Sequence, residues 1–157
     1  MSKTEGMTPT GILHFAIGVS DLETARTFYE DVLGCTYLRQ NDTTVFMKAG
    51  DDHFILTNTR NHTPPNPPGE YEFHHAFMVE SATFDAALAH LEKSGYPILV
   101  YEDEGHRTFT GRHGYIQDPF GNSIEIIDFQ GIGDFSKPDF EGRGRRRKMS
   151  KGRGTKA

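Results

Sequence analysis

Residues 12–34, ILHFAIGVSDLETARTFYEDVLG, decide the fold, because a strand pattern in them leads directly into a helix pattern. In 12–19 apolar side chains alternate with small or polar ones, which places His14 on the face opposite the apolar residues. Apolar residues then recur at helical spacing over 22–32, and Gly34 is positioned to end the helix. The stretch predicts a strand followed by an amphipathic helix.

A second stretch repeats the first. Residues 72–95, EFHHAFMVESATFDAALAHLEKSG, again join a strand pattern to a helix pattern that ends at Gly95. His74 occupies in this stretch the place that His14 occupies in the first. Internal repetition of this kind indicates a fold built from two copies of one supersecondary unit.

Short strand patterns separated by turn residues follow each helix. The prediction is therefore an α+β fold of two tandem βαβββ modules that form a cup-shaped mixed sheet around a metal site. The segment between the modules holds four of the eight prolines and is predicted to be a linker. The predicted boundaries are one domain at 10–131, modules at 12–58 and 72–130, the linker at 59–71, and a basic, disordered tail at 132–157.

Charge is distributed unevenly along the chain. Residues 137–157 contain nine Lys and Arg and two acids, which leaves eight basic and 20 acidic residues in 1–136. An acidic body disfavours nucleic-acid binding, since phosphate contacts need local positive charge. The tail is either a solvated extension or a weak electrostatic anchor for nucleic acid or an acidic partner.

Cys35 is the one cysteine, so no disulfide can form within the chain, which fits a reducing compartment. No apolar run is long enough to cross a membrane, and residues 1–10 lack the apolar stretch of a secretory signal. We expect a cytoplasmic protein without a membrane segment.

Three residues have the chemistry of metal ligands. His14 and His74 lie at equivalent places in the repeats, and Glu125 is flanked by isoleucines on the last predicted strand. A carboxylate in such surroundings is unfavourable to bury unless it is paired or binds a metal. Two histidines and one carboxylate suit Fe(II), and also Mn(II), Ni(II) or Zn(II). Each residue taken alone is more often structural.

The pattern of His14-x-Ala with a following Phe-Tyr-x-x-Val-Leu-Gly, then His74-x-Ala-Phe-x-Val, then Asp118-Pro-Phe-Gly-Asn-x-x-Glu125, resembles the glyoxalase / bleomycin resistance / extradiol dioxygenase superfamily. The resemblance covers residues 12–129. It implies paired βαβββ modules around a metal held by His14, His74 and Glu125. It also implies a homodimer, in which the ligands come from one chain or from two chains that exchange modules.

Within that superfamily, the sequence is most similar to the extradiol ring-cleaving dioxygenases. The resemblance implies catalytic roles for His53, His106 and Tyr115, with His113 as a weaker candidate on the face of Tyr115. The expected reaction is cleavage of an aromatic diol by O₂ at Fe(II). Two structural alternatives remain open. His53 is then a solvated histidine at a turn, and Tyr115 is a packed tyrosine of a strand.

Two alternatives remain. One is a lyase or transferase similar to glyoxalase I or to the fosfomycin-modifying enzymes. Glyoxalase I commonly takes a fourth ligand from the last strand of its first module, and residues 53–59 offer no carboxylate there. The other is a drug-binding protein without catalytic activity, similar to bleomycin resistance proteins.

Overall fold

The structure is a computed structural model that describes residues 8–103 and 109–133. Its chain divides into two compact units, with the boundary between His62 and Thr63. That boundary falls inside the proline-rich segment 59–71, so each unit contains the strands and the helix of one βαβββ module.

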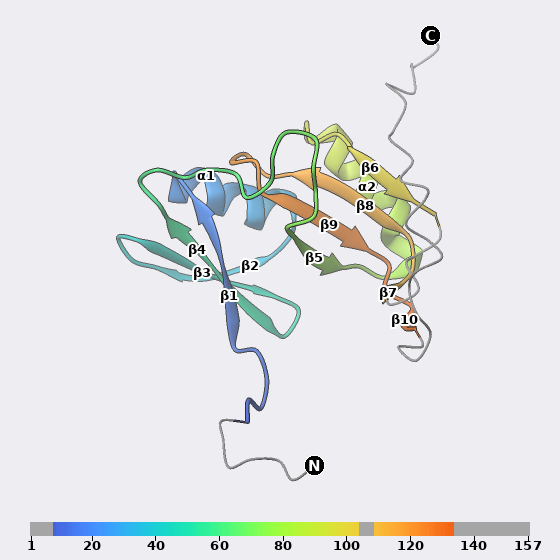
Figure 1. Ribbon diagram of the computed structural model, residues 1–157, viewed down its shortest axis with the longest axis horizontal. Coiled ribbons are helices and arrows are strands. Elements are labelled where there is room, and N and C mark those ends of the chain that lie inside the picture. Colours follow the sequence, from blue (N-terminus) through green and yellow to red (C-terminus); the bar gives the residue numbers. More distant parts are fainter. Residues whose placement is uncertain (1–7, 104–108, 134–157) are drawn as a thin grey trace. The chain divides into compact units, whose positions relative to one another are not determined.

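The first unit is a four-stranded sheet with one helical segment (Figure 1). The strands lie in the order β1-β4-β3-β2, with β1 parallel to β4 and the other pairs antiparallel. Its elements are β1 (His14–Val19), α1 (Leu22–Thr27), the π-helical turn η1 (Phe28–Val32), β2 (Thr36–Gln40), β3 (Thr44–Ala49) and β4 (Asp52–Asn58).

The helical segment of this unit differs from the regular helix that the sequence predicts. Asp21 caps α1 by accepting a hydrogen bond from the Thr24 backbone N–H at 2.7 Å. After the six residues of α1 the helix widens into the π-helical turn, where the adjacent side chains of Phe28 and Tyr29 are both buried. Gly34, with φ of +73°, follows the turn as predicted.

Aromatic contacts connect the helical segment to the sheet. The Tyr29 ring lies 5.6 Å from the Phe54 ring of β4, which also stacks on Phe15 of β1. The buried face of β1 is the predicted one, whereas His14 on the other face is exposed.

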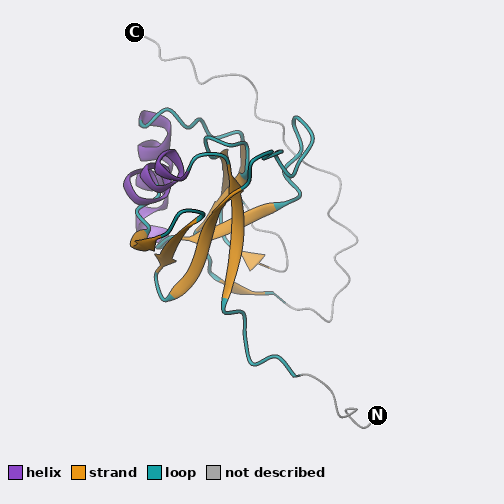
Figure 2. Ribbon diagram, turned by 90° about the vertical axis from the view of Figure 1, so that its left-hand side faces the viewer, coloured by secondary structure: helices purple, strands orange, loops and turns teal. Residues whose placement is uncertain are grey.

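The second unit repeats this strand order as β5-β9-β8-β6, with β5 parallel to β9 (Figure 1). Figure 2 colours the strands of the chain orange and its helices purple. The helix of the second unit lies against the sheet at Gly114, where a Cβ atom would come within 2.9 Å of a Leu88 methyl carbon. The elements are β5 (His74–Met78), the 3₁₀ turn η2 (Ser81–Thr83), α2 (Phe84–Lys93), β6 (Val100–Glu102), β7 (Phe109–Thr110), β8 (His113–Gln117), β9 (Ser123–Ile127) and β10 (Gly131–Ile132).

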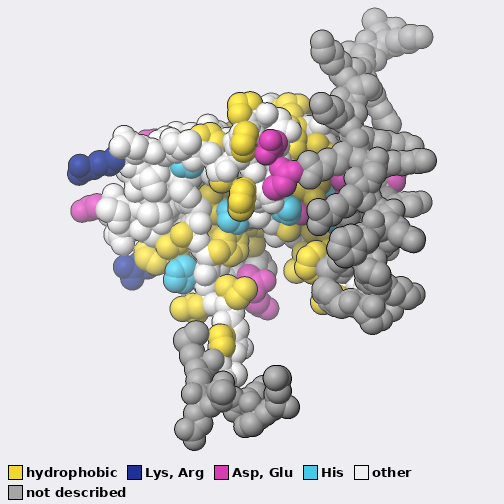
Figure 3. Space-filling model, in the orientation of Figure 1, with side chains coloured by type: hydrophobic (Ala, Val, Ile, Leu, Met, Phe, Trp, Pro, Cys, Tyr) yellow, Lys and Arg dark blue, Asp and Glu magenta, His cyan; other side chains and the backbone are white. Residues whose placement is uncertain are grey.

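The α+β class and the two βαβββ modules are therefore confirmed. The pairing of β7 with β10 is not predicted by the sequence, because strands of two residues show no alternation. It brings Ile132, at the start of the predicted tail, opposite Phe109. Both residues are exposed, and hydrophobic side chains (yellow) reach the surface of the face seen in Figure 3. The rest of the tail, 134–157, lies outside the described residues.

Among the described residues, no helix has the length and apolar character needed to span a membrane.

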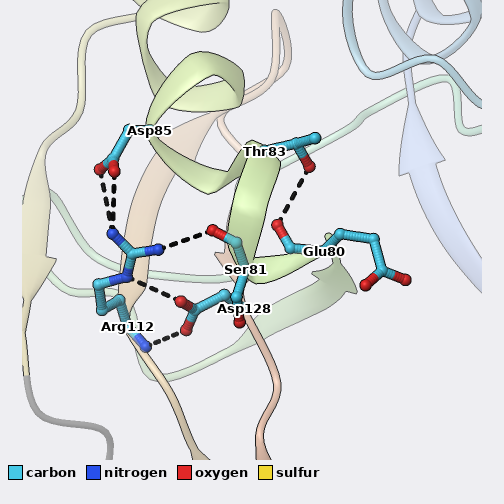
Figure 4. A network of polar contacts seen from close by, with 6 residues as sticks. All are labelled: Glu80, Ser81, Thr83, Asp85, Arg112 and Asp128. Carbon is cyan, nitrogen blue, oxygen red and sulfur yellow. Dashed lines mark hydrogen bonds and ion pairs between the residues drawn. The ribbon is translucent and has the colours of Figure 1, made fainter.

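A polar cluster around Arg112 joins β8, β9 and the start of α2 (Figure 4). The Arg112 guanidinium donates to Asp128 at 2.7 Å, to Asp85 at 3.1 Å and to the Ser81 carbonyl at 3.0 Å. Asp128 is fully buried and also accepts from the Arg112 backbone N–H. Gly111 is required beside it, since a Cβ there would lie 2.3 Å from the Asp128 carbonyl oxygen. The cluster fixes the chain just before β8 against the end of β9.

We expect Asp128→Asn to lower the free energy of unfolding at neutral pH. Burial alone would raise the pKa of Asp128, but hydrogen bonds from Arg112 outweigh burial and lower it. Stability from a carboxylate with a lowered pKa is present at neutral pH and is lost as the pH falls through that pKa. The difference between wild type and Asp128→Asn should therefore shrink as the pH falls below about 4, the ordinary range for aspartate.

Urea unfolding followed by circular dichroism at several pH values measures this difference. Asp85→Asn is the matched control, because Asp85 bonds the same guanidinium from an exposed position and should contribute little. Equal effects of the two substitutions at all pH values would contradict the prediction.

Candidate metal-binding site

Strands β5 and β9 of the second unit bring two of the three predicted ligands together. They pair in parallel, with His74 opposite Ser123 and Ala76 opposite Glu125. The His74 Nε2 atom lies 2.8 Å from the Glu125 Oε2 atom. His74 and Glu125, far apart in the sequence, are therefore direct neighbours on one face of this sheet.

Glu125 is a buried carboxylate on a strand whose residues are all buried. A second histidine, His113 of β8, contacts the Glu125 Oε1 atom through its Nδ1. Burial alone would raise the pKa of Glu125, but the hydrogen bonds from His113 and His74 outweigh burial and lower it to about 2. The carboxylate is therefore ionised at neutral pH, as a metal ligand must be.

The orientation of the His74 ring is set by a backbone contact. Its Nδ1 lies 2.9 Å from the Tyr71 carbonyl oxygen, which can only accept, so Nδ1 carries a proton. The hydrogen bond from Nε2 to Glu125 raises the pKa of His74 despite its partial burial. A metal ion bound at Nε2 would take the place of the proton shared with Glu125. A carbonyl behind the far ring nitrogen is the usual support of a metal-binding histidine.

Tyr115 lies next to this pair. It is opposite Glu125 in the antiparallel β8–β9 register, and its ring meets the His74 ring edge-on at 5.4 Å. The predicted proximity of Tyr115 to the ligands is thus observed within this unit, while its catalytic role stays a prediction.

The other predicted residues lie elsewhere. His14 and His53 belong to the first unit, where they are exposed partners across β1 and β4. His106 lies outside the described residues. Within residues 8–103 and 109–133, no group of three His, Cys, Asp or Glu side chains is placed to hold a metal ion. The structure brings together His74 and Glu125 and adds His113 to them.

The contact between His113 and Glu125 is a feature that the sequence indicates only weakly. Alternation places His113 on the face of Tyr115, but the partner of each residue depends on strand register. In the observed register Tyr115 is opposite Glu125 and His113 is opposite Ile127. His113 is therefore a diagonal neighbour of Glu125, close enough for a histidine ring to reach the carboxylate.

Two βαβββ modules with the same strand order, one of which carries a histidine–carboxylate pair, define a class of paired-module proteins. Residues 11–126 match the model of the glyoxalase/bleomycin resistance protein/dioxygenase superfamily. The chain belongs to this superfamily, as the sequence predicted.

Two curated relatives are thiol-transferring enzymes by name. The chain is 29% identical over 115 residues to the glutathione transferase FosA of Serratia marcescens, covering 72% of this chain and 77% of the relative. It is 28% identical over 117 residues to the metallothiol transferase FosB of Staphylococcus epidermidis, covering 74% and 80%. Among solved structures, a lactoylglutathione lyase from Agrobacterium tumefaciens matches with a TM-score of 0.61 and 25% identity, covering 77% of this chain and 95% of that one.

The prediction of an extradiol dioxygenase is wrong, because the named relatives are thiol transferases and a glutathione-adduct lyase. The motifs on which the prediction rested are those of metal ligands and turns, which serve different reactions in this superfamily. The aromatic diol and O₂ are therefore wrong as substrates, and so is ring cleavage as the reaction. That His53, His106 and Tyr115 act in catalysis stays a prediction. The relatives are enzymes, which agrees with the coarser prediction of an enzyme.

We expect His113→Phe to weaken the binding of Mn(II) or Zn(II) by about 10–100-fold, the usual effect of losing a partner that orients a ligand. Phenylalanine keeps a ring of similar size but removes the hydrogen bond to Glu125. Isothermal titration calorimetry measures the affinity. His90→Ala, at an exposed position on α2, is the control and should leave the affinity unchanged. Equal affinities of wild type and His113→Phe would exclude this role for His113.

Proposed function

We propose that this chain is a metal-dependent enzyme that joins a small thiol, such as glutathione, to an oxygen-bearing electrophile. The observation that carries the proposal is the buried, ionised Glu125 paired with Nε2 of His74. The names of the two curated relatives supply the reaction class.

The proposed metal ligands are His14, His74 and Glu125. His14 and His74 begin equivalent strands, and both strands lie at the edge of their own sheets. The donors fit a divalent ion, since Glu125 is ionised and the Nδ1–H tautomer of His74 leaves Nε2 to coordinate. Such an ion supplies Lewis acidity, which polarises an oxygen atom of the substrate.

The protein groups around this pair would hold and orient the reactants. His113 keeps the Glu125 carboxylate ionised and fixed in direction. The Tyr115 ring, edge-on to His74, would contact the substrate. In the proposed addition a C–S bond forms, the C–O bond of a strained ring breaks, and the thiol proton ends on the freed oxygen.

One residue of the first unit favours thiol transfer over a glyoxalase-like isomerisation. Ile55 of β4 lies opposite Ala16 of β1, just as Glu125 of β9 lies opposite Ala76 of β5. The first module therefore has isoleucine at the place equivalent to the carboxylate. A resemblance to glyoxalase I would imply a fourth ligand from this strand, and this chain has no carboxylate at that place.

The bound metal is proposed to be Mn(II), Ni(II), Zn(II) or Fe(II). Fe(II) was preferred over the other ions because of the expected reaction with O₂. That preference is lost because a dioxygenase reaction is no longer expected. We further propose that the two modules form one domain and that the chain is a homodimer, whose mass light scattering measures.

We expect Glu125→Gln, His74→Ala and His14→Ala each to abolish tight binding of a divalent ion, because each removes one donor of a three-donor site. Equilibrium dialysis with elemental analysis measures the bound metal. Glu92→Gln, at an exposed position on α2, is the matched control. Full metal content in all three variants would refute the ligand set.

Mixing inactive His14→Ala and Glu125→Gln chains restores activity only if a site takes donors from two chains.

We expect the metal-loaded protein to consume glutathione in the presence of fosfomycin, whose epoxide is a strained electrophile. Liquid chromatography with mass spectrometry detects the adduct, and Glu125→Gln should reduce its rate of formation by at least about 100-fold. Glu92→Gln should retain the wild-type rate. Isomerisation of the methylglyoxal–glutathione adduct, with no adduct formed from a panel of epoxides, would instead favour a lyase.

A further inference from the structure

The proline-rich segment between the modules contains one buried polar side chain, Asn66. It lies between two pairs of prolines, yet only 8% of its surface is exposed. Its carboxamide accepts from the Phe73 backbone N–H at 2.9 Å and donates to the Phe73 carbonyl at 2.7 Å. It also donates to the Ser123 hydroxyl at 3.1 Å. Both N–H groups and the oxygen of the carboxamide therefore bond to Phe73, which precedes β5, and to Ser123, which begins β9.

The two hydrogen bonds between the Asn66 carboxamide and the Phe73 backbone replace the bonds that a neighbouring strand would make. Asparagine side chains carry an amide group and can replace a peptide group in hydrogen bonding. Here the amide bonds both the N–H and the C=O of one residue, as a paired residue does in an antiparallel ladder. Phe73 precedes β5, so the contact fixes the chain at the point where the edge strand begins.

The position of this contact connects it to the proposed metal site. Phe73 is adjacent to His74 in the chain, and Ser123 is opposite His74 in the β5–β9 register. Tyr71, whose carbonyl accepts from His74 Nδ1, lies between Asn66 and Phe73 in the chain. The carboxamide therefore holds both ends of the short segment that presents the Tyr71 carbonyl to the imidazole.

The segment is also held at its start. Pro64 packs on Gly121, where a Cβ atom would lie 2.9 Å from the Pro64 ring and where φ is +79°. Pro67 restricts the backbone of Asn66 to extended conformations, and the Glu70 backbone N–H donates to the Pro67 carbonyl at 3.1 Å. Little freedom remains for Asn66 to take another position.

We propose that Asn66 is a positioning residue that holds the Tyr71 carbonyl against Nδ1 of His74 and so keeps Nε2 directed at Glu125 and the metal. This inference rests on the proposed function for the metal, whereas the orientation of the His74 ring is a property of the protein alone. Loss of the carboxamide frees the Tyr71 carbonyl to move, and the His74 ring then loses the hydrogen bond that fixes its orientation.

The test compares wild type, Asn66→Ala and Asn66→Asp as full chains without metal. Long-range ¹H–¹⁵N correlation spectra show which ring nitrogen carries each proton, and His74→Ala identifies the signals of His74. Wild type should show an Nδ1 proton that the Tyr71 carbonyl protects from exchange with water. Both variants should lose this protected signal, whereas the Nε2 proton bonded to Glu125 should remain. The aspartate keeps the size of the side chain but cannot donate to the Phe73 carbonyl. Affinity for Zn(II) should fall by about 10-fold or more in both.

Two controls separate positioning from general stability. Asn41→Ala removes an asparagine that accepts a turn hydrogen bond from Thr43 at 3.0 Å in the first unit, and Val45→Ala destabilises a buried strand there. Both should keep the protected Nδ1 proton of His74 and the wild-type affinity for Zn(II). Ser123→Ala removes one of the three bonds of Asn66 and should have the smaller effect, since the Phe73 contacts remain.

The inference is overturned if a folded Asn66 variant keeps the protected Nδ1 proton, or if Val45→Ala changes this proton and the Zn(II) affinity as much. If Asn66→Ala does not fold, Asn66→Asp decides. Absence of Zn(II) binding by wild type would overturn the proposed function, and the exchange of the Nδ1 proton would still decide the role of Asn66.

Discussion

The second unit is organised around one buried charge, the carboxylate of Glu125. An ionised carboxylate inside a strand of isoleucines is unfavourable by several kcal/mol unless its oxygens are bonded. The order β5-β9-β8 meets this requirement, because β9 lies between a parallel neighbour that supplies His74 and an antiparallel neighbour that supplies His113. The Arg112–Asp128 cluster then fixes β8 against β9 just beyond these contacts. Packing and chemistry therefore depend on the same three strands.

The two units share a strand order but not a site. Their matching registers align His14 with His74, and they also align His53 with Ser123 and Ile55 with Glu125. The histidine on the edge strand is thus kept in both copies, whereas the carboxylate is present in one. A repeated fold with a single carboxylate supports one kind of metal site built on the second unit. The first unit has a histidine at the start of its edge strand and, at the place of the acid, an apolar side chain.

Much of this arrangement could be predicted from the sequence, because it depends on local periodicity. Alternation placed His74 and Glu125 on strands, and the repeat defined the modules and the segment between them. The contact between His113 and Glu125 depends on register, which a lone strand pattern does not determine. The role of Asn66 depends on the path of a proline-rich loop, which has no periodicity at all. The π-helical turn at Phe28 and Tyr29 is likewise a response to packing against the sheet.

The reaction could not be read from the ligands, and the reason is chemical. Two imidazoles and a carboxylate make a metal site that polarises oxygen atoms in many kinds of substrate. What separates one reaction from another is the set of neighbours that hold the second reactant and move protons. In the function proposed for this chain, Tyr115 beside His74 would be one such neighbour, and Ile55 would leave the first unit without a fourth ligand. Neither residue belongs to a ligand motif, so the motifs that identify the superfamily do not by themselves determine its chemistry.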